Sequence, residues 1–286
     1  MLVEILTAEE TMISTMLGKT RAIDAVHHTL VDSLETAVSN AVAEGADYTM
    51  KTRTTPTRLT NIVELVSIPF AVTRTQQAID HYHGTDELTR QETKALREYG
   101  NSVEFDLVRS TLVSGASGTV PKMQGLIAHI SKSTNTTAHS SGTVWSASIL
   151  KGLMKANMDN SNGDVATDIF MGSYLKDKTD DFTNKTGISY DGANAKSIIS
   201  AVDIFETGLG KVRVHYHRYV QQSTDATGRV LAIRPEKHKV AYLEMPYVDR
   251  DLARSGPYDK RAVVGSMTLE TRNQDSNFFA SGFSIG

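Results

Sequence analysis

The sequence of 286 residues contains no cysteine, which excludes disulfides, thiolate metal sites and cysteine nucleophiles. It also lacks a surplus of basic residues, because 30 Lys and Arg stand against 33 Asp and Glu. A general nucleic-acid-binding protein needs such a surplus to neutralise phosphates. Apolar runs long enough to span a bilayer are missing as well, so we expect no membrane partner. The hydrophobic fraction of 40% is ordinary for a globular protein.

Motifs of enzymes are scarce. The stretch Gly282–Gly286 matches the G-x-S-x-G pattern of a nucleophile elbow, with Ser284 as the nucleophile. That motif requires a helix after the serine, and the sequence ends two residues later. We therefore expect no catalytic residue, and an intracellular serine hydrolase that uses Ser284 is a minor alternative.

Two histidine pairs, His81 with His83 and His215 with His217, have the spacing that places both imidazoles on one face of a strand. Such a pair can ligate a metal, but neither has a third ligand at a recognisable spacing. We expect these histidines to lie on a surface or at an interface, and we expect no metal or cofactor.

The segment 57–80 has the pattern of one unusually long strand. Before it, Glu44–Asp47 is a turn signal, so residues of about 35–75 are predicted to form one long hairpin with arms of roughly 40 Å. A two-stranded ribbon is marginal in water, and no hydrophobic segment nearby covers both faces. Either the ribbon folds back on its own domain, or another chain covers it. Residues 23–34 are interpreted as a strand.

A long amphipathic helix is predicted to begin at Asp86 and to end at the cluster 114–118, which gives about 27 residues and a rod of about 40 Å. Its apolar stripe has helical spacing and consists of Ala95, Tyr99, Val103 and Leu107. Three charge pairs are expected on its outer face, namely Asp86 with Arg90, Lys94 with Glu98, and Asp106 with Arg109.

The second half of the chain mixes helix and strand patterns, which makes the fold class α+β. Residues 131–143 are almost entirely Ser, Thr, Asn and His, and we expect a domain boundary there. The segments that follow are predicted as helices over 147–160 and 173–182, and as strands over 167–172, 197–207, 210–220, 228–235, 263–273 and 277–286.

One charge pattern suggests a contact. Between Tyr48 and Val63 the chain carries Lys51, Arg53 and Arg58 and no acid, whereas the long helix is rich in acids that include Glu92, Glu98 and Glu104. A basic hairpin tip and an acidic rod can attract each other between neighbouring subunits. Two independently solvated surfaces are an equally open interpretation.

These elements in this order resemble the major capsid (major head) protein of tailed bacteriophages. The matching stretches are NAVAEGADYTMKTRTTPTRLTN, RTQQAIDHYHGTDELTRQETKALREYGNSVEFDLVRS with the junction Thr73–Ala78 at its start, PKMQGLIAHI, and MPYVDRDLARSGPYDKRAVVGSMTLETRNQ. They cover most of the chain from about residue 20, and the nearest likeness is to major head proteins of podophage-like and related phages.

The resemblance implies the capsid protein fold. An N-terminal arm would occupy 1–22, and an extended β-hairpin loop (E-loop) would occupy 35–72 and reach over an adjacent subunit. A peripheral domain would combine 23–34, 73–142 and 256–286, with the long helix as its spine. A mixed α/β axial domain would span 143–255.

The resemblance also implies a function, which is self-assembly as hexamers and pentamers into the icosahedral head that encloses packaged double-stranded DNA. The implied partners are other copies of the chain and portal, scaffolding and decoration proteins, with DNA enclosed but not bound at a specific sequence. The implied place is the virion, assembled in the host cytoplasm. A tail or baseplate protein is the alternative from the same particle.

Overall fold

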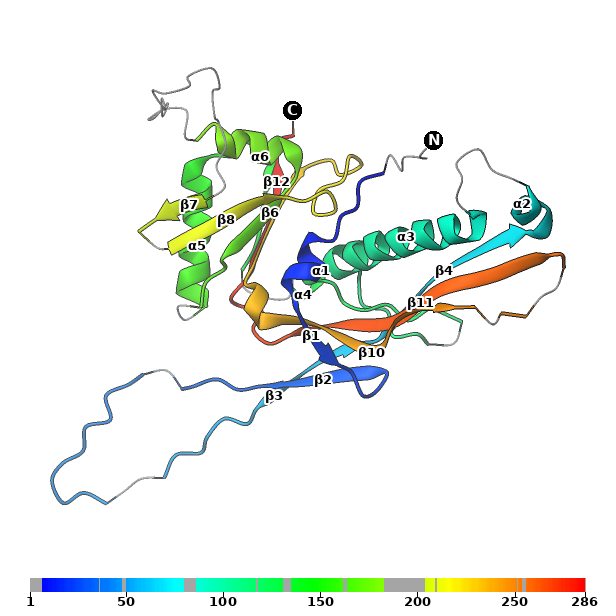
Figure 1. Cartoon of the computed structure of the whole chain (residues 1–286). Helices are drawn as coiled ribbons and strands as arrows, with labels where there is room; N and C mark the ends of the chain where they lie inside the picture. Colours follow the sequence, from blue (N-terminus) through cyan, green and yellow to red (C-terminus); the bar gives the residue numbers. More distant parts are fainter. Residues whose placement is uncertain are drawn as a thin grey trace, which may run out of the picture.

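A computed structural model describes residues 7–35, 37–47, 50–79, 86–116, 118–130, 135–161, 164–182, 204–208, 210–250, 252–253 and 256–285. The helices are α1 Met12–Met16, α2 Arg74–Ala78, α3 Glu87–Arg109, α4 Leu126–Ile130, α5 Ala147–Asn160 and α6 Ser173–Asp180, with a 3-10 turn η1 at Pro235–Lys237. The strands are β1 Gly18–Arg21, β2 Val26–Val31, β3 Thr57–Ile62, β4 Glu64–Thr73, β5 Thr136–Thr143, β6 Asp168–Met171, β7 Ile204–Thr207, β8 Gly210–Tyr216, β9 Gly228–Ile233, β10 His238–Asp249, β11 Tyr258–Thr271 and β12 Phe278–Phe283. Figure 1 shows a sheet with the long helix α3 along it, a second sheet with α5 and α6, and a hairpin that extends from the body.

The first sheet has the strand order β1-β10-β11-β4, and α3 lies along one of its faces (Figure 1). The predicted stripe is confirmed, because Ala95, Tyr99, Val103 and Leu107 are buried. Asp86 is the N-cap, and its carboxylate accepts a hydrogen bond from the Thr89 N–H (3.2 Å). The helix has 23 residues and is shorter than expected. It ends at Arg109 because the chain turns there, with the Gly125 N–H donating to the Ser110 carbonyl (2.8 Å).

The expectation of one strand over 57–80 is wrong. The segment breaks at Val63, whose N–H donates to the Ala25 carbonyl (2.8 Å). The two strands β3 and β4 on either side of this break pair with different partners, β2 and β11, and belong to different sheets. The chain then enters the short helix α2, capped by the Thr73 hydroxyl. The segment 57–80 has a continuous strand pattern, but its two halves pair with different strands, and the strand is therefore broken at Val63.

The paired part of the hairpin is also shorter than expected. Strand β2 pairs antiparallel with β3, from Val26 opposite Ile62 to Val31 opposite Thr57, and no described residue between 32 and 56 belongs to a strand. The hairpin therefore spans 26–62 and not 35–72. The strand expected within 23–34 is confirmed but forms the first arm of the hairpin, and β4 belongs to the body.

The second sheet has the order β5-β12-β9-β6-β8-β7. The helices and strands predicted in this half are confirmed as α5, β6, α6, β8 and β9. The described part of the strand predicted at 197–207 is β7. The boundary expected at 131–143 is replaced by β5, which pairs parallel with β12. Two strands cross the expected domain limits, since β10 joins the first sheet and β12 joins the second.

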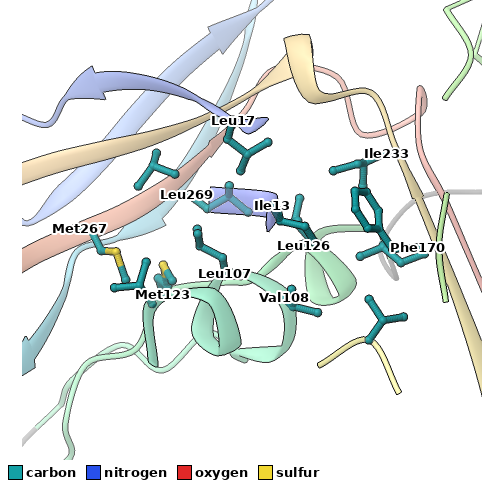
Figure 2. Close-up of a cluster of buried hydrophobic side chains, with 14 of the residues drawn as sticks. Ile13, Leu17, Leu107, Val108, Met123, Leu126, Phe170, Ile233, Met267 and Leu269 are labelled. Atoms are coloured by element: carbon teal, nitrogen blue, oxygen red, sulfur yellow. The ribbon is translucent and has the colours of Figure 1, made fainter. Parts of the chain in front are cut away.

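One core links the two halves. Leu107, Val108, Met123 and Leu126 meet Phe170 and Ile233 of the second sheet, as Figure 2 shows. The N-terminal segment joins the same core through the buried Ile13 and Leu17, and β1 pairs with β10. The described part of the expected arm is thus docked on its own subunit. A second core beneath α5 and α6 contains Trp145, Leu150 and Ile169.

Candidate assembly surfaces

The root of the hairpin is anchored by Asn61, which is only 4% exposed. Its side-chain NH2 donates to the carbonyls of Gln124 (3.1 Å) and Leu269 (2.8 Å), and its oxygen accepts from the Gln124 N–H (2.8 Å). These bonds join β3 to β11 and to the segment before α4. They hold the hairpin at a set angle to the body.

A contact between a histidine and a carboxylate supports the same root. The Nε2 atom of His27 on β2 lies 2.9 Å from a carboxylate oxygen of Glu270 on β11. Burial raises the pKa of Glu270, but hydrogen bonds from Arg272 and His27 outweigh burial and leave the pKa below its ordinary value. Glu270 is therefore held ionised beside the hairpin.

Beyond this root the hairpin exposes apolar side chains to solvent. Leu34 is 98% exposed, Val42 is 76% exposed and Met50 is 90% exposed. All described residues of this loop from Asp32 to Pro56 are exposed, and Figure 1 shows the loop extending away from the first sheet. Side chains of this kind are ordinarily buried, and a contiguous exposed set marks an interaction surface.

The three basic residues of the hairpin are exposed, as the hypothesis of an intersubunit contact requires. Arg58 lies on β3, and Lys51 and Arg53 lie in the loop. The Nζ atom of Lys51 donates to the Asn40 side-chain oxygen (3.1 Å), which joins the two arms of the loop.

The acidic residues of α3 do not form the continuous exposed acidic surface that the sequence suggested. Glu104 is fully buried within the subunit, so the expectation of an intersubunit contact through it is wrong. Glu92 is bound by two arginines of its own chain, Arg250 (2.7 Å) and Arg261 (2.6 Å). The hydrogen bond from Arg250 is the main cause that lowers the pKa of Glu92. Of the three predicted acids, Glu98 alone is exposed.

The expected charge pairs of α3 are confirmed in one case. Lys94 and Glu98 lie 3.7 Å apart. Arg90 pairs instead with Glu87 (2.5 Å).

The third expected pair, Asp106 with Arg109, is replaced by a bridge between the two halves of the molecule. Arg109 binds Asp225 (2.8 Å) and Gln222 (2.7 Å) in the segment between β8 and β9. Burial, together with the charge of Glu64, raises the pKa of Asp106 to about 7. Both residues thus face the interior and not an outer surface.

Glu104 forms a polar junction that the sequence did not reveal. Its carboxylate accepts from the backbone N–H groups of Ile13 (2.6 Å) and Ser14 (2.8 Å) at the start of α1. It also binds Nε2 of His217 (2.9 Å). The junction fastens the N-terminal segment, α3 and the second half to one another. A carboxylate inside an otherwise apolar helix stripe was the available signal.

The face of the first sheet opposite α3 is covered only in part, because the hairpin root covers Ala241 and Glu270 but leaves other side chains exposed. Along β4 the side chains alternate, with Val66 and Val72 buried toward α3 and Leu65 58% exposed on the other side. In the paired register, Leu65 of β4 lies opposite Ser266 of β11, and Ser266 lies opposite Glu244 of β10. Tyr247 of β10 lies opposite Val264, which is two residues before Ser266 on β11. Leu243, Met245 and Tyr247 of β10 are exposed as well. We call Leu65, Leu243, Met245 and Tyr247 the outer apolar patch.

An open groove separates the hairpin from the body. Leu34, Glu35, Thr55 and Leu59 line its hairpin side. The opposite side is formed by polar residues, which are Asp164, Glu236, Lys237, Arg272, Asn273, Gln274 and Asp275. The groove is therefore suited to polar contacts.

His215 at the end of β8 and His217 just after this strand contact two different carboxylates. His215 binds Asp168 (3.0 Å), whereas the next histidine, His217, binds Glu104. Burial raises the pKa of Asp168, but hydrogen bonds from Arg213, Thr167 and His215, together with the charge of Arg213, outweigh burial and lower the pKa. No group of three possible metal ligands occurs among the described residues, and the pair His81 and His83 lies outside them.

The serine of the G-x-S-x-G pattern lies just after β12, and its N–H donates to the Thr143 carbonyl (2.9 Å). Gly282 has φ of +97°, and a Cβ atom there would collide with the carbonyl of His139. The glycine thus permits the close packing of β12 on β5. This geometry gives the hydrolase alternative no support. None of the helices in the described ranges has the length and apolarity of a membrane span.

Solved structures with the same fold are shell proteins. A capsid chain of a native GTA particle matches with a TM-score of 0.67 and 12% identity, over 99% of this chain and 93% of that one. The capsid of Myoviridae phage XM1 matches with a TM-score of 0.64 and 10% identity, over 98% and 95%. The SrpI encapsulin of Synechococcus elongatus matches with a TM-score of 0.66 and 10% identity, over 100% and 91%.

This chain thus shares the fold of these capsid and encapsulin chains. The family model described as SU10 major capsid protein matches residues 2–284, so the chain belongs to the SU10 major capsid protein family. A search of curated proteins found no match. The predicted fold and the function of a capsid protein of the virion are confirmed, and the family is a structural one.

Proposed function

We propose that this capsid protein assembles as hexamers and pentamers into an icosahedral head that encloses packaged double-stranded DNA. The observation that carries the proposal is the exposure of apolar side chains among the described residues of the hairpin loop 32–56, namely Leu34, Val38, Val42 and Met50. A closed shell supplies cover for them on every copy, because each hairpin can lie on the next subunit. The near-neutral charge of the chain also suits a container that releases its DNA.

The contact of the hairpin with its neighbour has an electrostatic part. Lys51, Arg53 and Arg58 are exposed, and Glu98 is the exposed acid of the predicted set on α3. Their opposite charges favour the approach of a hairpin tip to the helix of an adjacent subunit. Glu92 and Glu104 take no part, since both are engaged within their own subunit.

The peripheral and axial domains correspond to the two sheets. The four-stranded sheet with α3 forms the peripheral domain, and the six-stranded sheet with α5 and α6 forms the axial domain around the local symmetry axes. The remaining partners are portal, scaffolding and decoration proteins, and assembly takes place in the host cytoplasm. The chain performs no catalysis in this role.

A second candidate is a protein compartment without a viral genome, which the likeness to an encapsulin favours. The family assignment favours the viral head over this candidate and over a tail or baseplate protein.

Expression of the chain alone tests the proposal. Size-exclusion chromatography and electron microscopy should show capsomers or closed shells. A stable compact monomer at high concentration would contradict it. Co-expression with the packaging components of the same phage separates the two candidates, because a viral head fills with double-stranded DNA and a genome-free compartment does not.

A further inference from the structure

The first arm of the hairpin loop carries a helical pattern although it forms no helix in the isolated subunit. Leu30, Leu34, Val38 and Val42 recur every four residues, and Ala37 and Ala41 fall on the same side of a helix. A strand would require alternation with a period of two. The pattern explains why pairing between β2 and β3 stops at Val31 and Thr57.

Signals for both ends of a helix flank the pattern. Asp32 is followed three residues later by Glu35, which is the arrangement of a capping box. At the other end Gly45 has φ of +81°, the left-handed conformation that commonly follows the last turn of a helix. The Ala46 N–H donates to the Ala43 carbonyl (3.1 Å) and closes a turn there. The segment 33–44 is therefore delimited as one helix of twelve residues.

Its length explains why the described residues 33–35 and 37–44 have no regular structure in the subunit. Isolated helices shorter than about 12–15 residues are marginal in water, and most helical stability comes from packing of the apolar face. Leu34, Val38 and Val42 pack on nothing here, with exposed fractions of 98%, 60% and 76%. The missing element is a surface that covers this stripe.

We propose that residues 33–44 fold into an amphipathic helix when the hairpin docks on a second copy of this chain, with the stripe on the outer apolar patch of that copy. The proposal rests on the proposed function, because it requires assembly. The patch matches the stripe in character, through Leu65, Leu243, Met245 and Tyr247, whereas the groove beside the hairpin is lined mostly by polar residues. The stripe does not reach the outer apolar patch of its own subunit, because the loop points away from the first sheet (Figure 1).

A distance measurement in assembled shells tests the change of conformation. The chain has no cysteine, so Ser33→Cys with Glu44→Cys carries two spin labels at defined positions on the polar side. Electron-electron double resonance on shells with few labelled subunits should give about 16 Å, the rise of eleven helical residues. A distance of about 36 Å, as in an extended chain, would overturn the helix and leave the shell function standing. Absence of shells from the unlabelled chain would overturn both proposals.

Two matched pairs of variants test the stripe and its receptor. Ala37→Gly with Ala41→Gly should raise the critical concentration for assembly about 30-fold, because each glycine disfavours the helix by about 1 kcal/mol. Ala46→Gly, outside the helix, is the control, and an equal effect of both would contradict the proposal. Leu65→Ser with Met245→Ser should likewise weaken assembly, whereas Leu112→Ser, an exposed leucine beyond the end of α3, should not. An unchanged critical concentration for the patch variant would exclude this patch as the receptor.

Discussion

The Nε2 atom of His217 lies 2.9 Å from Oε1 of Glu104, and both side chains are completely buried. The Tyr219 N–H donates to Nδ1 of the same histidine (3.2 Å), so the imidazole proton resides on Nε2 and is donated to the carboxylate. Glu104 also accepts from two N–H groups of the N-terminal segment. One carboxylate on α3 thus holds together three parts of the subunit that are far apart in sequence.

Loss of this carboxylate should destabilise the fold. Glu104→Gln leaves at least one buried donor without an acceptor, and we expect the free energy of unfolding to fall by about 3 kcal/mol. Urea unfolding of the unassembled subunit, followed by the fluorescence of the buried Trp145, measures it. Glu98→Gln on the exposed side of the same helix is the control and should change the stability by less than about 0.5 kcal/mol. Equal effects of the two variants would show that the junction contributes nothing particular.

The anchor of the hairpin should be equally sensitive. Asn61→Ala removes the partners of the Gln124 N–H and of two carbonyls in a buried place, and we expect a loss of about 2–4 kcal/mol. Hydrogen exchange of β2 and β3 should accelerate in the unassembled subunit. Asn40→Ala, in the exposed loop, serves as the control. Unchanged protection of β3 in Asn61→Ala would refute the anchoring role.

His238 should make the fold sensitive to acid. Burial lowers its pKa to about 4, against an ordinary value of 6.5, despite a hydrogen bond to Asn277. The unfolded chain therefore binds a proton below pH 6.5 that the folded chain refuses, and stability is lost as the pH falls from 6.5 toward 4, by about 3 kcal/mol. His238→Gln keeps both hydrogen-bonding ends without titrating, so its unfolding free energy should depend less steeply on pH in this window. Parallel curves for the two proteins would contradict this assignment.

Reversal of the hairpin charge should affect assembly more than folding. The variant Arg53→Glu with Arg58→Glu places two acids at the proposed contact with an acidic neighbour, and we expect a critical concentration at least 10-fold higher. The unfolding midpoint of the unassembled subunit should stay unchanged, because both side chains are exposed. Light scattering and urea unfolding measure the two quantities. Equal losses in both would remove the idea of a contact between subunits.

The sequence predicted the helices and strands better than it predicted which of them pair with one another. The apolar stripe of α3 is a property of neighbouring residues, and it is confirmed. The break at Val63 depends on β2 and β11, which are distant in sequence, so the pattern of 57–80 alone did not reveal it. For the same reason, the positions of β10 and β12 in opposite sheets did not follow from their order in the chain.

The candidate contact residues show a similar limit. Charge and helical spacing placed Glu98 correctly on the surface, but they also placed Glu104 there. Its burial depends on His217 and on the start of α1, which no local pattern connects with α3. The charge of Glu92 is compensated by Arg250 and Arg261 from the end of the chain. Long-range partners thus decide which acids remain available to a neighbour.

The most direct test of the account is a cryo-electron microscopy map of the particles that the purified chain forms. The account predicts a closed shell in which residues 32–56 of every subunit lie on an adjacent subunit, with their apolar side chains covered. A map in which the loop folds back on its own subunit, or in which neighbouring subunits leave it bare, would contradict the central claim.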